Sequence, residues 1–163
     1  MRKHNVYREG FIAGVIGATS VAVWFFILDL VAAHPLYTPE ILGRSVLSIL
    51  GPDRGDSRLL VVTFYTIVHY AAFIVVGIIA TSIIHAARKQ TAILSGAVLL
   101  FVVFEFGFYT MTALLTESPL GSLAWYQIGA ANVIATVLMG LYLWRSHPKL
   151  GSRVDFALSG RES

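Results

Sequence analysis

The residues of this chain that could do chemistry are a few polar side chains inside long apolar segments. His69 lies ten residues after the start of one apolar stretch, and Glu105 lies ten residues before the end of the next one, in each case about 15 Å along a helix. Because successive spans run in opposite directions, both side chains are expected at the same depth. A charge in hydrocarbon costs about 2.5–3.5 kcal/mol on insertion scales, so each needs a partner, and a His69–Glu105 hydrogen bond would supply one. Residues four apart share a helix face. The spacing predicts a polar column in one half of a bilayer, with the candidates Asp29, Tyr65, His69, Glu105, Tyr109 and Gln127.

Three interpretations of this column are open. The first, which we favour, is a buried hydrogen-bonded network that holds the helices in register. The second is a proton or ion path, because chains of Asp, Glu and His serve proton relays in membranes. It is weakened because the other half of the bilayer holds no acidic or basic group before His85. The third is a site for a small ligand such as a quinone headgroup.

Catalytic and metal-binding patterns are missing from the sequence. There is no cysteine, no nucleophile elbow, no zinc-protease helix motif and no glycine-rich phosphate loop. A haem held by two histidines would need them at one depth, whereas His69 and His85 lie about 24 Å apart along one helix. We therefore expect no enzyme, no catalytic residue and no metal site. No cofactor is indicated, and haem or a quinone remain alternatives.

The elements that must position these side chains follow from composition. Hydrophobic residues make up 56% of the chain and charged residues 13%, against about 25% charged in soluble domains. A span needs about 20 apolar residues, and in hydrocarbon the backbone must bond within its own segment, as a helix does. The sequence predicts an all-α integral membrane protein, a single domain of four transmembrane helices in an up-down-up-down bundle. The predicted spans are residues 11–33, 59–87, 91–115 and 118–144.

The loop between the first two spans, residues 34–58, contains a further predicted helix. Thr38 is expected to cap it, Pro39 and Glu40 to occupy its first turn, and Gly51 with Pro52 to end it. Its apolar residues fall on one face, which is typical of an amphipathic helix in the membrane interface. Covering a groove between spans and docking on a partner subunit are the alternatives.

Small residues recur on two of the predicted spans and allow close helix packing. In the fourth span we favour packing within the bundle, whereas in the first span a seam for another subunit is an equal alternative. These residues are Gly10, Gly14, Gly17, Gly129, Ala131 and Ala135.

Nine of the twelve Lys and Arg residues lie in the two terminal segments and in the turn between the second and third spans. By the positive-inside rule this predicts both termini on the cytoplasmic side, with residues 145–163 as a basic tail. The excess of basic residues indicates contact with lipid headgroups, not nucleic acid. We expect a multi-pass protein of a bacterial cytoplasmic (inner) membrane.

For function, we expect a small accessory or structural subunit of a larger membrane complex, such as an energy-transducing one. Its partners would be the lipid bilayer and other membrane subunits. The alternative is a stand-alone transporter or ligand-binding protein that uses Asp29, His69 and Glu105.

Overall fold

The computed structural model describes residues 5–51, 57–87 and 125–146, and these ranges are helical apart from short connections. Three of the helices are long and apolar enough to cross a bilayer, namely Val6–Val31, Arg58–Ala86 and Tyr126–Ser146. The expected all-α fold is confirmed for the described residues, and a multi-pass membrane protein in contact with lipid is plausible. The helices are α1 (Val6–Val31), α2 (Tyr37–Leu50), α3 (Arg58–Ala87) and α5 (Trp125–Ser146). The predicted span over residues 91–115 lies outside the described residues.

Helix α1 begins five residues before the predicted start at Phe11. The side chain of Asn5 accepts a hydrogen bond of 3.1 Å from the backbone N–H of Tyr7, which satisfies one of the donors left open in a first helical turn. The predicted span followed the apolar run alone, and the helix extends beyond it by a polar first turn. The earlier start places Glu9 inside the helix.

Glycines on α1 and α3 let these two antiparallel helices touch backbone to backbone. A Cβ atom added to Gly77 would lie 2.2 Å from the Gly10 carbonyl oxygen and 2.5 Å from the Gly14 nitrogen. A Cβ atom at Gly14 would lie 2.5 Å from Cα of Ile74. No side chain fits at this crossing. The small residues of α1 therefore serve packing inside the chain, and Gly77 is a contributor that sequence analysis missed.

Helix α5 packs on another side of α1, again antiparallel to it. Ala131 and Ala135 are buried against Val21, and a Cβ atom added to Gly17 would lie 2.5 Å from the Met139 sulfur. Gly129 of the same predicted set is half-buried. Packing within the bundle, the interpretation favoured for this span, accounts for Ala131 and Ala135.

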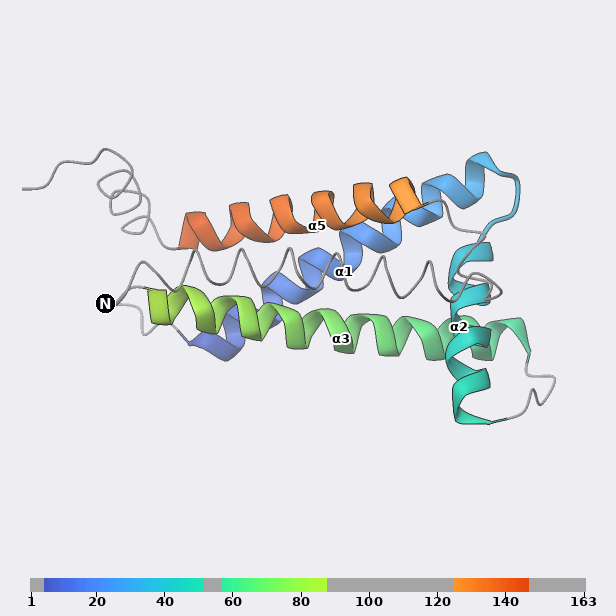
Figure 1. Ribbon diagram of the computed structural model, residues 1–163, viewed down its shortest axis with the longest axis horizontal. Coiled ribbons are helices and arrows are strands. Elements are labelled where there is room, and N and C mark those ends of the chain that lie inside the picture. Colours follow the sequence, from blue (N-terminus) through green and yellow to red (C-terminus); the bar gives the residue numbers. More distant parts are fainter. Residues whose placement is uncertain (1–4, 52–56, 88–124, 147–163) are drawn as a thin grey trace, which may run out of the picture.

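Helix α2 crosses the first turns of α3 (Figure 1). Gly43 allows the contact, since a Cβ atom there would lie 2.7 Å from a methyl group of Val61. Glu40 adds ion pairs to Arg44 at 3.1 Å and to Arg58 of α3 at 2.7 Å. These pairs are partly exposed, so they stabilise the arrangement only modestly. We call this end of the bundle the α2 end.

The start of α2 differs from the prediction. Leu36, in the left-handed region with φ of 65°, is the N-cap residue and provides no side-chain cap. Thr38, the expected cap, lies inside the first turn, so that prediction was wrong. The sequence pattern placed a hydroxyl at the helix start correctly but could not show which donor or acceptor it would meet.

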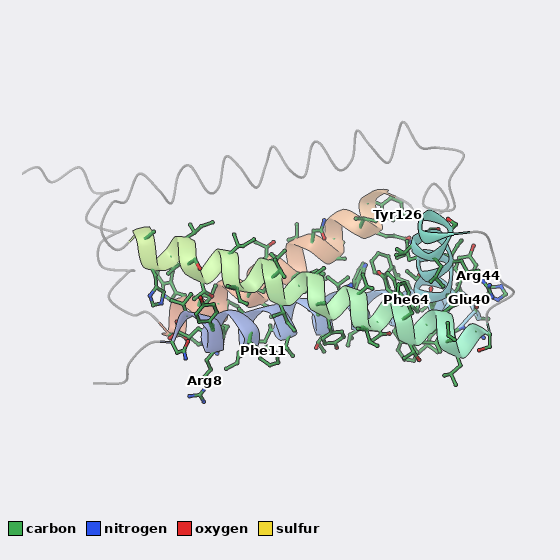
Figure 2. The ribbon with its side chains drawn as sticks, turned by 90° about the horizontal axis from the view of Figure 1, so that it is seen from below. Arg8, Phe11, Glu40, Arg44, Phe64 and Tyr126 are labelled. Carbon is green, nitrogen blue, oxygen red and sulfur yellow. The ribbon has the colours of Figure 1, made fainter. Side chains whose placement is uncertain are left out.

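Large apolar side chains cover the outer faces of α1, α3 and α5, as contact with lipid requires. Phe11, for example, is half exposed and projects away from the bundle (Figure 2). The same view places Arg8 toward one end of the molecule and Glu40 and Arg44 at the opposite, α2 end. Charged groups therefore mark both ends of the apolar helices.

Candidate functional site

A pocket of about 290 Å³ lies between α1 and α3 beneath the start of α2. The two long helices touch near Gly10 and Gly77 and separate toward the α2 end (Figure 1). Bulky side chains such as Phe25, Phe26 and Tyr65 occupy the wider end and line the pocket. The lining is mainly apolar, and its polar members include Thr19, Asp29, Thr38, Tyr65, His69 and Tyr70. The structure thus brings three of the six predicted candidates, Asp29, Tyr65 and His69, around one cavity.

His69 links α3 to α1. Its Nε2 atom lies 3.0 Å from the carbonyl oxygen of Ala18. Because a carbonyl only accepts, Nε2 carries the proton, and in the neutral ring Nδ1 is left as an acceptor. The imidazole is enclosed by aromatic rings, with Tyr65 stacked on it at 5.7 Å and Phe73 tilted against it at 4.8 Å between centroids. His69 is therefore held in one orientation from both helices.

Two further hydroxyl groups belong to the site. The hydroxyls of Tyr70 and Thr19 share a hydrogen bond of 3.0 Å between α3 and α1. The Tyr70 ring also meets His69 edge-on at 5.9 Å. Sequence analysis missed both residues, because only the packing of α1 on α3 joins positions so far apart in the chain. The hydroxyl of Tyr65 makes no hydrogen bond to any of the residues that the structure describes.

Asp29 is buried, with 5% of its surface exposed, and it bonds to Thr38, which is 4% exposed. One carboxylate oxygen accepts the Thr38 backbone N–H at 2.9 Å, and the other accepts the Thr38 hydroxyl at 2.7 Å. The first-turn position of Thr38 also places the negative charge at the positive end of α2. The carboxylate therefore anchors the start of α2, and both Asp29 and Thr38 line the pocket.

Of the other three predicted candidates, the structure describes only Gln127, which does not line this pocket. Gln127 is half-buried on α5, where its backbone carbonyl accepts a hydrogen bond of 3.1 Å from the Trp24 indole N–H. Glu105 and Tyr109 lie outside the described residues. The His69–Glu105 hydrogen bond therefore stays a prediction.

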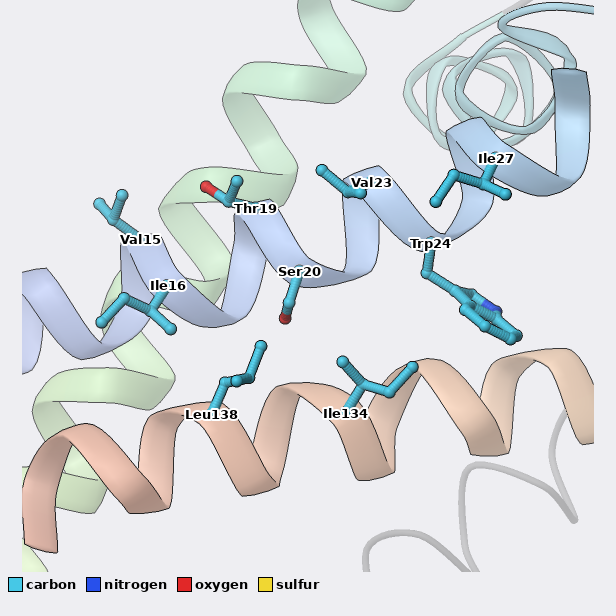
Figure 3. A pocket seen from close by; sticks show the side chains of 9 residues that line it. All are labelled: Val15, Ile16, Thr19, Ser20, Val23, Trp24, Ile27, Ile134 and Leu138. Carbon is cyan, nitrogen blue, oxygen red and sulfur yellow. The ribbon is translucent and has the colours of Figure 1, made fainter.

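A second cavity, of about 510 Å³, is a groove between α1 and α5. Figure 3 shows Ile16, Ser20 and Trp24 directed toward α5, and Thr19 and Val23 along a different side of α1. Thr19 and Val23 line both cavities. The pocket with its few polar side chains and the largely apolar groove therefore adjoin along one side of α1.

The end opposite α2 carries a polar pair that sequence analysis missed. His85 Nε2 lies 3.2 Å from a carboxylate oxygen of Glu9, and both side chains are largely buried. The predicted first span began after Glu9 and so excluded it. Among the described residues, polar contacts between α1 and α3 thus occur near the middle of both helices, at His69 and Tyr70, and at the end opposite α2.

In the part of the chain that the structure describes, no three His, Cys, Asp or Glu side chains are grouped so that they could hold a metal ion. Comparison with known proteins found no family model, no curated protein and no solved structure that matches the chain.

Proposed function

We propose that this chain is a four-span membrane protein that binds a small amphipathic ligand in the pocket between α1, α2 and α3. The observation that carries the proposal is the convergence of Tyr65, His69 and the Thr19–Tyr70 pair on one mainly apolar cavity. An apolar pocket with a few convergent polar groups is the usual form of a small-molecule site. We assign no catalytic role to any of these residues.

The size and surroundings of the pocket support an amphipathic ligand. Its volume of about 290 Å³ is at the lower end of the range for small-molecule sites, roughly 300–1,000 Å³. It therefore suits a single ring or headgroup. The adjoining groove offers an apolar surface on which a hydrocarbon chain could lie.

Ligand binding fits the described helices better than transport does. From the pocket toward the opposite end, α1 and α3 close on each other at Gly10, Gly14 and Gly77. This backbone contact leaves no room between these two helices for a path that joins His69 to the Glu9–His85 pair. A relay through the bundle would have to pass elsewhere.

The accessory-subunit hypothesis stays a prediction. Two of the features behind it, the small-residue seams and the amphipathic helix, are occupied by contacts within this chain. Gly14 packs on Ile74, and Gly43 packs on Val61. Contacts within the chain thus account for part of both surfaces, which is why we place the ligand site first.

Four spans and the proposed orientation have separate support. α3 ends at the Glu9–His85 pair, whereas α5 begins near Trp24, toward the α2 end. Residues 88–124 must join these opposite ends, and the apolar run over 91–115 is long enough to cross. The distribution of Lys and Arg supports cytoplasmic termini, and the location that we propose is a bacterial cytoplasmic membrane.

A pocket-filling substitution tests the proposal. Ala22 lines the pocket and Ala72 is an exposed alanine of α3 outside it, so Ala22→Phe and Ala72→Phe form a matched pair. Protein purified in mild detergent would be extracted and its bound amphiphiles measured by mass spectrometry. We expect a small amphiphile enriched with the wild type and with Ala72→Phe, and depleted with Ala22→Phe at an unchanged melting temperature. The same set of extracted molecules in all three proteins would contradict the proposal.

A further inference from the structure

We infer that the pocket selects an uncharged, ring-sized headgroup that carries a hydroxyl, as in an alkylphenol or a quinol, over the same ring with an oxygen that only accepts hydrogen bonds. This inference rests on the proposed ligand site and names its ligand class.

The charge of the pocket lining favours an uncharged headgroup. Among the residues that the structure describes, no Lys or Arg lines the pocket, and the one formal charge in this lining is that of Asp29. Both oxygens of this carboxylate already accept hydrogen bonds from Thr38, at the N-terminus of α2. An anionic headgroup would meet no cation, and a cationic one would compete with the anchor of α2. An uncharged headgroup avoids both costs.

The donor and acceptor groups of His69 and Tyr65 favour a ligand hydroxyl. Nε2 of His69 donates to Ala18, so the remaining ring nitrogen, Nδ1, is an acceptor, and none of the described residues donates a hydrogen bond to it. Tyr65, stacked on His69 at 5.7 Å, carries a hydroxyl that can donate. A ligand hydroxyl satisfies both groups, since it donates to Nδ1 and accepts from Tyr65. A carbonyl or ether oxygen satisfies Tyr65 alone and leaves Nδ1 without a donor.

The shape of the pocket and the groove favours a flat ring with an attached chain. Aromatic side chains, among them Phe25, Phe26 and Tyr70, form much of the wall, and flat rings pack against such surfaces by stacking or edge contacts. Thr19 and Val23 line both the pocket and the groove, so a chain attached to the ring can pass them and continue along α1 toward Ile16 and Leu138. An alkyl-substituted aromatic alcohol meets the three requirements together.

A pair of probes that differ only at the oxygen tests the inference. The full chain in nanodiscs would be titrated with 4-octylphenol and with 4-octylanisole, the methyl ether, by equilibrium dialysis. We expect the phenol to bind about ten-fold more tightly, because a buried acceptor left without its donor costs about one factor of ten in affinity or more. Tyr65→Phe should weaken phenol binding several-fold, whereas Tyr7→Phe, at an exposed position of α1, should not.

The outcomes separate the two proposals. Equal affinity for both probes, with both lost in Ala22→Phe, would overturn the inferred hydroxyl preference and leave the ligand site standing. Binding of both probes that Ala22→Phe does not change would overturn the ligand site itself. His69→Leu is expected to remove the preference for the phenol. If that variant fails to fold, the wild-type affinity ratio and Tyr65→Phe still decide the question.

Discussion

Asp29, near the end of α1, binds Thr38 in the first turn of α2 through both of its carboxylate oxygens, at 2.9 Å to the backbone nitrogen and 2.7 Å to the hydroxyl. The chain reverses between them through Ala33 and Leu36, which both adopt positive φ values. This backbone conformation costs free energy in residues other than glycine and asparagine. Contacts with the surrounding structure must therefore stabilise it. The Asp29–Thr38 pair is placed to do so, and it holds α2 over the pocket.

Thr38→Val tests this anchor. Valine keeps the shape and the backbone N–H but removes the hydroxyl, which leaves one oxygen of a buried carboxylate without its donor. We expect a loss of about 1–3 kcal/mol, or several degrees in the midpoint of thermal unfolding in detergent. Thr63→Val, at an exposed position of α3, is the control and should stay within about 0.5 kcal/mol of the wild type. Equal midpoints for the two variants would show that the pair does not anchor α2.

Gly77→Ala tests the backbone contact of α1 and α3. The added methyl group would lie 2.2 Å from a carbonyl oxygen of Gly10, so the helices must move apart, at a cost of about 1–3 kcal/mol or more. Gly140→Ala is the matched control, because nothing lies within 4 Å of its added methyl group. Alanine is the better helix former by about 1 kcal/mol, so this control should unfold at the same temperature as the wild type or slightly above. Identical shifts for both variants would refute the close contact.

The Glu9–His85 contact, at the end opposite α2, is testable by a double-mutant cycle. The carboxylate side chain is 12% exposed and the imidazole 20%, so solvent screens the contact only in part. We expect Glu9→Gln and His85→Gln to be non-additive in unfolding free energy, with a coupling of about 0.5–3 kcal/mol. Arg8→Gln with Ser82→Ala, two exposed positions on the same helices, should be additive. Additive effects in the first pair would mean that the contact contributes nothing to stability.

The proposed orientation is testable because the chain contains no cysteine. Asn5→Cys and Ser48→Cys place single thiols at exposed positions, one before α1 and one on α2. A membrane-impermeant maleimide should label Ser48→Cys in intact cells, and should label Asn5→Cys only after the membrane is opened. The reverse pattern would invert the topology, and equal labelling in intact cells would place both positions on the same side.

The helices themselves could be predicted from the sequence, since a membrane helix satisfies its backbone hydrogen bonds internally and needs only a long enough apolar run. For this reason the expected start and end of α3, residues 59–87, agree with Arg58–Ala87 within one residue. The start of α1 was predicted less well. Its first turn is polar and is stabilised by the Asn5 cap, which an apolar window does not register.

The contacts between the helices were decided by the tertiary structure. Small residues predicted close packing of the first span but not its partner, because glycine permits an approach from any neighbour, and only the position of Gly77 on α3 supplies one here. The hydrogen-bond partners of the polar side chains in the site could not be predicted for the same reason. Asp29 was singled out as a buried charge that needed a partner, yet its partner is a threonine brought back by a chain reversal. Residue types and spacing thus determined which polar groups needed a hydrogen-bond partner. The packing of α1, α2 and α3 determined which partner each group has, because a hydrogen bond between helices depends on the distance and direction of atoms remote in the chain.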